Sequence, residues 1–585
     1  MNSIKSKDRL PEETVEILKK FFKERNFSLL IDESSSEIGS YSCEIWLKFK
    51  NIYLMHSNGK GTTPEYSLAS GLAELYERFC NRENIGYAPY FMTNIMKSNY
   101  KKYNYYMDPE EKVGIPFTEA MKIPPVKQII NLLSNNMEDY KEWIYNNFIG
   151  ECYVGLPYKN INDERDILYL DKKLLFASVG SNGMAAGNSF KEAFCQAMSE
   201  LCERAVYQNF YNSTSEPIYA LNIDKLNLST EILDMINKLP FTFYVLDLSN
   251  YVKAPVVALV IIDKDRLFSR IDMGSFPNAN IAVERTLTEI YQNVFSFNER
   301  FDLRFIPPFA KKYEDLMFDN PYTIIDNSYL PRNFFNRIQY VDNFNNDYYT
   351  DETSTESIYN FYINLIKKNN WSVYYNDCSL SKEMTALQLY SPDLFTSWLN
   401  IKKFYLSDNV KNDMDKLIGM TKEIRSMMEQ NDIYNDKFLF LINESNINLG
   451  NFRSDLLINF AGGNLLLPLY QSSEIGHKWL DLLTKSLENS NSIEYRVDCH
   501  PALKLFIGYP ALKKYLALIQ YKSYNKTFKE VSTDLAPYGI TVTQEEYNKC
   551  MNLDFLMLKT YYEPMAKFYN SEEYQMIIDG FTKKD

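Results

Sequence analysis

The pattern of apolar and polar positions predicts a mixed α and β part that covers roughly the first two thirds of the chain. A first helix is expected from Lys7 to Phe22, because Pro11 lies in its opening turn and apolar residues recur after it at helical spacing. Alternating or β-branched stretches predict strands at Ser42 to Phe49, near Ile52, at Ile167 to Val179 and at Phe241 to Ile262. Residues 96–150 and 300–355 are rich in Asn, Tyr, Asp and Pro, and predict loops and peripheral elements.

After about residue 395 the apolar spacing becomes helical. Helices are predicted at Val410 to Glu429, Ser454 to Ala461, Ile475 to Leu487, Leu512 to Tyr521 and Gln544 to Tyr569. We therefore expect two domains, an α+β domain over residues 1–395 and an all-helical domain over residues 396–585.

The segment from Ser181 to Arg204 carries an unusual row of acidic residues. It reads SNGMAAGNSFKEAFCQAMSELCER, a Gly-containing loop followed by a helix. Polar side chains recur in this helix at i, i+4, i+8 and i+11, at Glu192, Gln196, Glu200 and Glu203. Helical geometry places them on one face, where neighbouring carboxylates repel one another and resist burial. Bound cations would remove that cost.

Two further segments repeat this layout. The loop GKG, at Gly59 to Gly61, precedes a helix expected from about Pro64, with Ser70, Glu74 and Glu77 at i, i+4 and i+7. This helix and that of the Ser181 segment share the pattern ExxER. A weaker copy, IAVERTLTEIYQNVF, places Arg285, Glu289 and Gln292 at the same spacing. Such repetition predicts a pseudo-symmetric core whose helices line one cleft.

Composition excludes several classes of protein. The net charge is −13 and no long basic tract occurs, which argues against nucleic acid or an anionic membrane as the main ligand. The 8 cysteines are scattered without a CxxC pair, so no disulfide scaffold, zinc site or iron–sulfur site is indicated, and the 3 histidines are too isolated to form a triad. The longest apolar run, Ala254 to Ile262, is too short to span a bilayer, and the N-terminus has no apolar signal core. We expect a soluble cytoplasmic protein.

Paired carboxylates three residues apart suit a hard divalent cation, and Mg²⁺ prefers a few carboxylates together with phosphate oxygens. Glycine-containing loops before a helix offer backbone N–H groups to anions, and Lys60, Arg204 and Arg285 are candidate phosphate partners. The spacing GxxxxGK[ST] is absent, so this is not a Walker A site. Taken singly, an ExxER is usually a solvated helix face, GKG a turn, and Lys7 and Thr14 helix-start residues. The recurrence of one layout in three places favours a ligand site.

The chain resembles the YcaO family in three blocks, which occur in the family's order and spacing and read GKGTTPEYSLASGLAELYERF, SNGMAAGNSFKEAFCQAMSELCERAV and IAVERTLTEIYQNV. The resemblance covers roughly residues 1–395. It extends to NFRSDLLINFAGGNLLLPL, which is similar to part of the tetratricopeptide-like C-terminal domain of the full-length bacterial protein that gives the family its name.

This resemblance implies an enzyme that uses ATP and Mg²⁺ to phosphorylate the oxygen of a peptide backbone amide, after which a nucleophile adds and phosphate leaves. The residues implied as Mg²⁺ ligands are Glu74, Glu77, Glu200, Glu203 and Glu289. Those implied as nucleotide contacts are Lys7, Thr14, Lys60, Ser181, Asn188, Glu192, Arg204 and Arg285.

Azoline-forming members of the family usually end in a PxPxP tail. This chain ends GFTKKD and has no such motif. Thioamide-forming members and the namesake type also lack the PxPxP tail. The namesake type implies an accessory factor for β-methylthiolation of a small-subunit ribosomal protein, working with a radical-SAM methylthiotransferase. The chain itself has no CxxxCxxC. We therefore expect an accessory factor of this type, a homodimer through its helical tail. The alternatives are a thioamide- or azoline-forming enzyme of a peptide natural-product pathway, for which no leader-binding domain is visible before residue 30, and a scaffold whose helical repeats bind partners.

Overall fold

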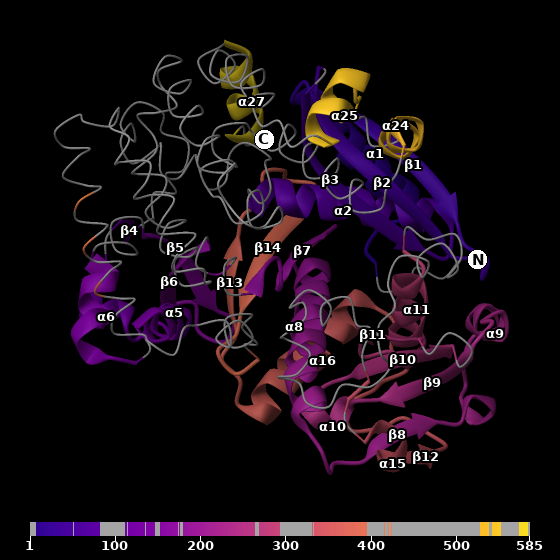
Figure 1. The fold of residues 1–585 in the computed structure, drawn as a ribbon. Coiled ribbons are helices and arrows are strands. Elements are labelled where there is room, and N and C mark those ends of the chain that lie inside the picture. Colours follow the sequence, from indigo (N-terminus) through magenta and orange to yellow (C-terminus); the bar gives the residue numbers. More distant parts are fainter. Residues whose placement is uncertain are drawn as a thin grey trace. The chain divides into compact units, whose positions relative to one another are not determined.

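A computed structural model gives the fold of the chain (Figure 1). It describes residues 7–50, 52–81, 112–113, 115–134, 136–146, 153–172, 175, 179–263, 268–292, 330–331, 333–394, 415, 419, 423, 527–536, 541–551 and 572–582. The chain forms two compact units. The first unit comprises residues 1–83, 155–404 and 580–585, and the second comprises residues 84–154 and 405–579.

The first unit begins with a three-stranded antiparallel sheet in the order β1-β2-β3. The elements of this part are α1 (Pro11–Glu24), β1 (Ser28–Ser35), β2 (Tyr41–Phe49), β3 (Ile52–Gly61) and α2 (Pro64–Asn81). Helices α1 and α2 join through aromatic side chains: Phe21 lies edge-on to Tyr76 with ring centroids 4.9 Å apart, and Phe22 meets Phe79 at 5.5 Å. These buried rings hold the two helices together.

Two predictions in this part need correction. Helix α1 starts at Pro11 rather than at Lys7, and the Glu13 carboxylate accepts the Leu10 N–H at its start. The residues GKG are not a loop, because β3 continues through Gly61. Gly59 allows this, since a Cβ there would lie 2.1 Å from the Ser67 carbonyl oxygen of α2. The strand and the helix therefore approach more closely than any side chain permits.

A second sheet has the strand order β11-β10-β9-β8-β12, antiparallel except for the parallel pair of β8 and β12. Its strands are β8 (Ile218–Leu221), β9 (Thr242–Asp247), β10 (Val256–Asp263), β11 (Phe268–Ser275) and β12 (Ile338–Val341). The helical segments associated with it are α8 (Phe190–Asn212), η3 (Ile223–Lys225), α9 (Thr230–Asn237), α10 (Ser249–Val252), α11 (Ala279–Ile290) and α15 (Phe334–Arg337). Helices α8 and α11 pack against β10 and β11.

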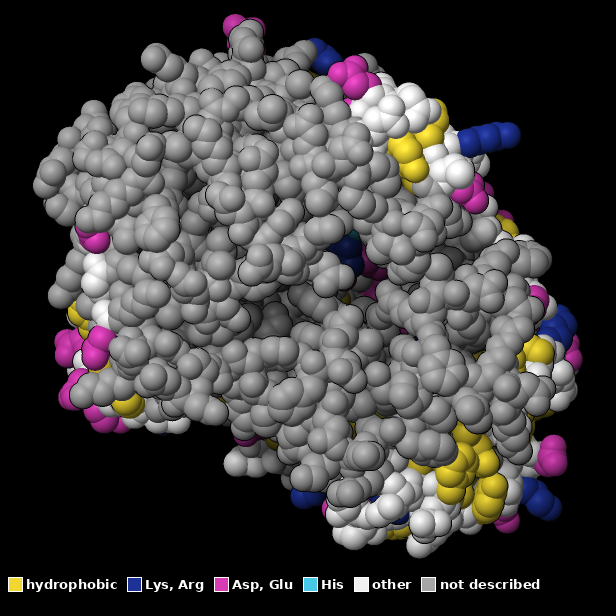
Figure 2. Space-filling view, in the orientation of Figure 1, with side chains coloured by type: hydrophobic (Ala, Val, Ile, Leu, Met, Phe, Trp, Pro, Cys, Tyr) yellow, Lys and Arg dark blue, Asp and Glu magenta, His cyan; other side chains and the backbone are white. Residues whose placement is uncertain are grey.

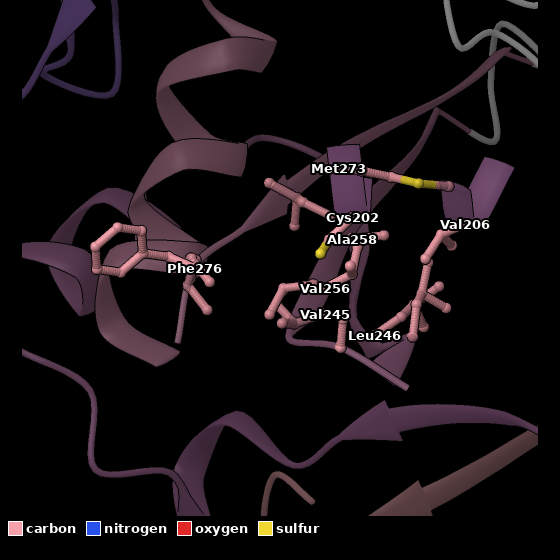
Figure 3. Close-up of a cluster of buried hydrophobic side chains, with 14 of the residues drawn as sticks. Cys202, Val206, Val245, Leu246, Val256, Ala258, Met273 and Phe276 are labelled. Atoms are coloured by element: carbon pink, nitrogen blue, oxygen red, sulfur yellow. The ribbon is translucent and has the colours of Figure 1, made fainter. Parts of the chain in front are cut away.

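The core between α8 and this sheet is apolar throughout. Figure 3 shows Cys202 and Val206 of α8 among side chains of β9, β10 and β11, including Val245, Ala258 and Met273. These residues are almost completely buried. The opposite side of α8 is thereby left to face the cavity described below.

The predicted single strand from Phe241 to Ile262 is wrong. The segment forms two antiparallel strands, β9 and β10, joined by the short helix α10. Lys253 adopts a left-handed conformation with φ +56° at the end of α10, and Pro255 has no N–H to donate. Strand β12 and helix α15 lie within residues 300–355, which were predicted as loops and peripheral elements.

A third sheet orders its strands β5-β13-β14-β7, with β6 paired to β5. The elements are β5 (Val154–Asn160), β6 (Ile167–Asp171), β7 (Met184–Gly187), α16 (Thr355–Asn369), β13 (Tyr374–Asp377) and β14 (Thr385–Tyr390). The strand predicted from Ile167 to Val179 is too long, since β6 ends at Asp171 and Lys172 and Leu175 are helical. The predicted loop SNGMAAGN is correct only up to Gly183, because Met184–Gly187 is β7.

The second unit contains β4 (Lys112–Val113), α4 (Phe117–Ala120), α5 (Pro124–Ser134), α6 (Glu138–Ile144), α24 (Phe528–Leu535) and α25 (Gln544–Met551). Residues 96–150, which were predicted as loops and peripheral elements, carry the helices α4, α5 and α6. Helix α25 lies at the start of the predicted helix Gln544 to Tyr569. Of the predicted helix Val410 to Glu429 the structure describes residues 415, 419 and 423, all of them helical, while the other three helices predicted after residue 395 lie outside the described residues. The tetratricopeptide-like domain stays a prediction. Helix α27 (Glu572–Thr582) follows.

The mixed α and β character of the core is confirmed by these sheets. Across the part of the chain that the structure describes, no helix combines the length and the apolar character needed to cross a membrane.

Candidate functional site

The first unit contains a polar cavity of about 480 Å³. Its walls include every residue that the sequence singled out as a candidate ligand: Lys7, Thr14, Lys60, Glu74, Glu77, Ser181, Asn188, Glu192, Glu200, Glu203, Arg204, Arg285 and Glu289, together with Gln292. These residues come from α1 and the segment before it, β3, α2, α8 with its preceding loop, and α11. In Figure 2, basic and acidic side chains are visible next to each other near the centre of the molecule's face.

Helix α8 supplies the row of polar residues predicted from its spacing. Ser189 caps the helix by accepting a hydrogen bond from the Glu192 N–H at 3.2 Å. Further along, the Glu200 carboxylate accepts the Gly183 N–H at 3.0 Å. Gly183 has φ +83°, a conformation that favours glycine, and its N–H is thereby directed at the helix. The loop before α8 thus holds one acidic residue of the row in place.

Several acidic residues of the cavity form ion pairs with basic partners. Glu74 forms an ion pair with Arg78 at 2.6 Å, and Glu289 of α11 pairs with Lys60 of β3. Arg204 lies 3.9 Å from carboxylate oxygens of both Glu200 and Glu203.

Arg285 of α11 bridges to the other walls of the cavity. Its guanidinium donates to the Ser275 carbonyl oxygen at 3.0 Å and to the side-chain oxygen of Gln196. Gln292 lies beyond the end of α11 at Ile290, which corrects its predicted position on the helix, although it still lines the cavity.

The segment before α1 closes one side of the cavity through Glu192. The Lys7 ammonium lies 3.1 Å from the Glu192 carboxylate, and the Asp8 N–H donates to the same group at 3.0 Å. Thr14, which is buried in α1, donates its hydroxyl proton to Asn188 Oδ1 at 2.9 Å. Lys7 and Thr14 therefore reach the cavity together although only Thr14 is helical.

Burial and charge shift the protonation equilibria of these groups. Burial raises the pKa of Glu200 to about 7, and it also raises the pKa of Glu203. Burial would lower the pKa of Arg204, but Glu203, Tyr207 and Glu200 hold it above its ordinary value. Arg204 therefore stays charged while the pKa of Glu200 lets that carboxyl gain or lose a proton near neutral pH.

Within the described residues, no three His, Cys, Asp or Glu side chains come close enough together to hold a metal ion. Four of the five predicted Mg²⁺ ligands, Glu74, Glu200, Glu203 and Glu289, are instead paired with arginine or lysine. Their carboxylate oxygens are nevertheless the hard donors that Mg²⁺ takes, especially when phosphate oxygens complete its coordination. The cationic partners suit phosphate equally well. The residues present therefore fit a nucleotide phosphate chain with Mg²⁺.

Asn58 is a cavity residue that the sequence interpretation missed. Its Oδ1 is buried and has no hydrogen-bond partner among the described residues, which is costly unless a ligand supplies one. Asn58 lies two residues before Lys60, so both side chains point to the same face of β3. Extending the predicted strand through GKG would have revealed it. Arg78, the last residue of the first ExxER, was likewise not singled out as a site residue and also lines the cavity.

The model of one protein family, described as YcaO cyclodehydratase, ATP- and Mg²⁺-binding, matches residues 58–394. The chain belongs to the YcaO family. ATP and Mg²⁺ are accordingly its cofactors, and the matched range contains the end of β3 together with α2, α8 and α11, which form most of the cavity wall. Lys7 and Thr14 lie before the matched range.

Two curated relatives are similar to this chain over part of their length. An uncharacterized protein of Haemophilus influenzae is 29% identical over 260 residues, and the ribosomal protein S12 methylthiotransferase accessory factor YcaO of Escherichia coli is 26% identical over 263 residues. Each alignment covers 42% of this chain and 42% of the relative. The similar region thus spans less than half of the length of these two relatives.

Solved structures with a related fold include a heterocyclase in complex with substrate and cofactor, with 18% identity, a TM-score of 0.44, and coverage of 66% of this chain and 52% of that one. Another is YcaO from Methanopyrus kandleri bound with AMPPCP and Mg²⁺, with 15% identity and a TM-score of 0.40. This match covers 66% of this chain and 91% of that one.

Proposed function

We propose that this YcaO protein binds Mg²⁺ and ATP in the cavity of the first unit and acts as an accessory factor in the β-methylthiolation of a small-subunit ribosomal protein. The observation that carries the site is the convergence of all candidate ligands on one cavity. The relative named as an S12 methylthiotransferase accessory factor supports the choice of substrate.

In this proposal the acidic residues of the cavity bind the cation and the basic residues bind the phosphate groups. Glu74, Glu77, Glu200, Glu203 and Glu289 would hold Mg²⁺, which offsets the negative charge of the phosphate chain. Lys60, Arg204 and Arg285 would contact phosphate oxygens. Lys7, Thr14, Ser181, Asn188 and Glu192 would position the nucleotide from the side of the segment before α1. By this division, the basic groups exchange their acidic partners for phosphate when nucleotide binds.

A second candidate is a peptide-modifying enzyme that activates backbone amides to form azolines or thioamides, and the cyclodehydratase description of the matched family favours it. It shares the cofactors and the site with the first candidate and differs in the substrate.

The intact masses of the small-subunit ribosomal proteins, compared between cells with and without this gene, separate the two candidates. Loss of one methylthio group from one protein supports the accessory role and identifies the substrate. Unchanged masses contradict it and leave the peptide-modifying enzyme, whose thioamide or azoline products a mass comparison of small peptides would then detect. Cells carrying the Glu203→Gln variant provide the control that links either result to the cavity.

A further inference from the structure

A second, small cavity lies beside the site, where α8 crosses the third sheet. It has a volume of about 20 Å³, and both Arg204 of α8 and Gln388 of β14 line it. Helix α8 packs against β7 and β14, and Gln388 is paired in register with Met184 of β7. Arg204 thus reaches from the nucleotide cavity on one side to this cavity on the other.

Two buried donors in this small cavity lack acceptors. Gln388 is 1% exposed, and its Nε2 has no hydrogen-bond partner among the described residues. The same holds for Nε of Arg204. The Tyr158 hydroxyl donates to Gln388 Oε1 at 2.6 Å, so that the NH₂ group points away from Tyr158. Leaving two such donors unsatisfied is unfavourable.

We propose that one buried water molecule occupies this cavity and joins Gln388 Nε2 to Arg204 Nε. The volume suffices for one water, and a buried water normally makes two to four hydrogen bonds, roughly three on average. Its oxygen can accept from both donors. Its protons can go to oxygen atoms of Asn182 and Ser391, two buried residues that line the same cavity.

Gln388 is then a positioning residue for Arg204. A terminal nitrogen of Arg204 lies 3.9 Å from a carboxylate oxygen of Glu200 and 3.9 Å from one of Glu203. These distances are too long for hydrogen bonds, so the two ion pairs leave the orientation of the guanidinium loosely defined. A water held by Gln388 would fix the guanidinium plane from its Nε edge. The remaining N–H groups would then be directed into the nucleotide cavity. The effect on nucleotide binding rests on the proposed function, whereas the water itself does not.

The water is tested in a crystal structure of the full-length protein, without nucleotide, at a resolution that shows ordered solvent. We expect density for one water within hydrogen-bonding distance of both Gln388 Nε2 and Arg204 Nε. An empty cavity, or a direct contact that fills it, overturns the proposal. This result is independent of whether the protein binds nucleotide.

The positioning role is tested by titrating a non-hydrolysable ATP analogue with Mg²⁺ in a double-mutant cycle. Gln388→Met keeps the side-chain length but removes the amide, and should weaken binding by about 5-fold. In an Arg204→Lys background, which has no Nε donor at this position, the same change should have almost no further effect. The control Asn360→Ala, on the exposed surface of α16, should leave the affinity unchanged. Equal effects of Gln388→Met in both backgrounds, or no effect in the wild type, contradict the positioning role. If the wild type itself does not bind the analogue, the proposed function fails while the crystallographic test still decides the water.

Discussion

Individual acidic residues of the cavity are neutralised in two ways, by proton uptake and by ion pairs with arginine or lysine. Glu200 combines both, since its pKa is raised to about 7 and Arg204 lies 3.9 Å away. Mg²⁺ takes carboxylates only in their deprotonated form, so its binding competes with protons. Metal affinity should therefore depend on pH in the neutral range.

The affinity for Mg²⁺ and the ATP analogue should rise as the pH increases from about 6 to about 8 and then level off, because Glu200 must lose its proton before it can bind the cation. Calorimetric titrations in two buffers with different ionisation enthalpies should show proton release near neutral pH. The Glu200→Gln variant should bind more weakly, with a flatter pH profile. A wild-type affinity that does not change over this range would show that Glu200 is not a ligand.

Asn58 should contribute to ligand binding through its buried oxygen. Replacing it by Ala removes an acceptor that has no partner among the described residues, and should reduce the affinity for Mg²⁺ and the ATP analogue by about 3- to 10-fold. Asn360→Ala on the exposed surface of α16 is the matched control and should have no effect. Equal affinities for Asn58→Ala and the control would mean that Asn58 does not touch the ligand.

At the scale of elements, the wall formed by β3 and α2 depends on glycine. A Cβ at Gly59 would meet the Ser67 carbonyl oxygen at 2.1 Å and the Gly71 nitrogen at 2.6 Å, both of which are backbone atoms. Backbone cannot move aside as a flexible side chain can. Lys60 is the next residue on the strand, so the close approach of β3 and α2 at Gly59 also sets the position of Lys60 in the cavity wall.

Gly59→Ala should force β3 and α2 apart and destabilise the fold by about 2 to 4 kcal/mol. Chemical denaturation followed by circular dichroism measures this loss. The control is Gly419→Ala, where none of the described residues comes within 4 Å of the added Cβ, and which should leave stability unchanged or slightly higher. A wild-type midpoint for Gly59→Ala would disprove the close packing.

Sequence patterns predicted elements that are set by local spacing and missed those that depend on distant packing or on an unusual backbone conformation. Helices α2, α8 and α11 were found because their acidic rows and apolar faces repeat within one element. The continuation of β3 through Gly61 depends on α2, which follows it in sequence but packs against its face, and no local pattern records that. The division of the stretch between Phe241 and Ile262 depends on the left-handed backbone at Lys253, a conformation that lysine rarely adopts.

The candidate site was predictable for a different reason. Spacing alone indicated that each acidic row shares a helix face, and the family resemblance joined rows that lie far apart in the chain into one cavity. Asn58 was missed because the predicted strand near Ile52 was not extended into GKG, which was taken as a loop. Gln388 was missed because its relation to Arg204 exists only after β14 pairs with β7 and packs against α8.

At the scale of the molecule, the chain returns to its first unit near residue 580. Phe581, in the last turn of α27, is 3% exposed and stacks on Phe79 with ring centroids 4.1 Å apart. It also contacts Phe27 at 5.4 Å. Removing residues 400–585 would thus uncover part of the aromatic core beside α2, so a truncation does not cleanly separate the two units.

Phe581→Ala should destabilise the protein by about 3 to 5 kcal/mol, because it leaves a cavity between Phe27 and Phe79. Thermal unfolding, compared with that of Met576→Ala, checks this, since Met576 is 47% exposed on the same helix and should have little effect. Similar unfolding temperatures for the two variants would argue against the packing of this turn in the first unit.

The central claim is that the acidic and basic residues of one cavity bind Mg²⁺ and ATP. Titration of the full-length protein with a non-hydrolysable ATP analogue, with and without Mg²⁺, tests it most directly, using Glu203→Gln as the site variant and Glu356→Gln, a surface carboxylate of α16, as the control. We predict Mg²⁺-dependent binding that the control retains and that Glu203→Gln weakens by about 10-fold or more. Binding of equal strength in both variants would contradict the assignment of this cavity as the nucleotide site.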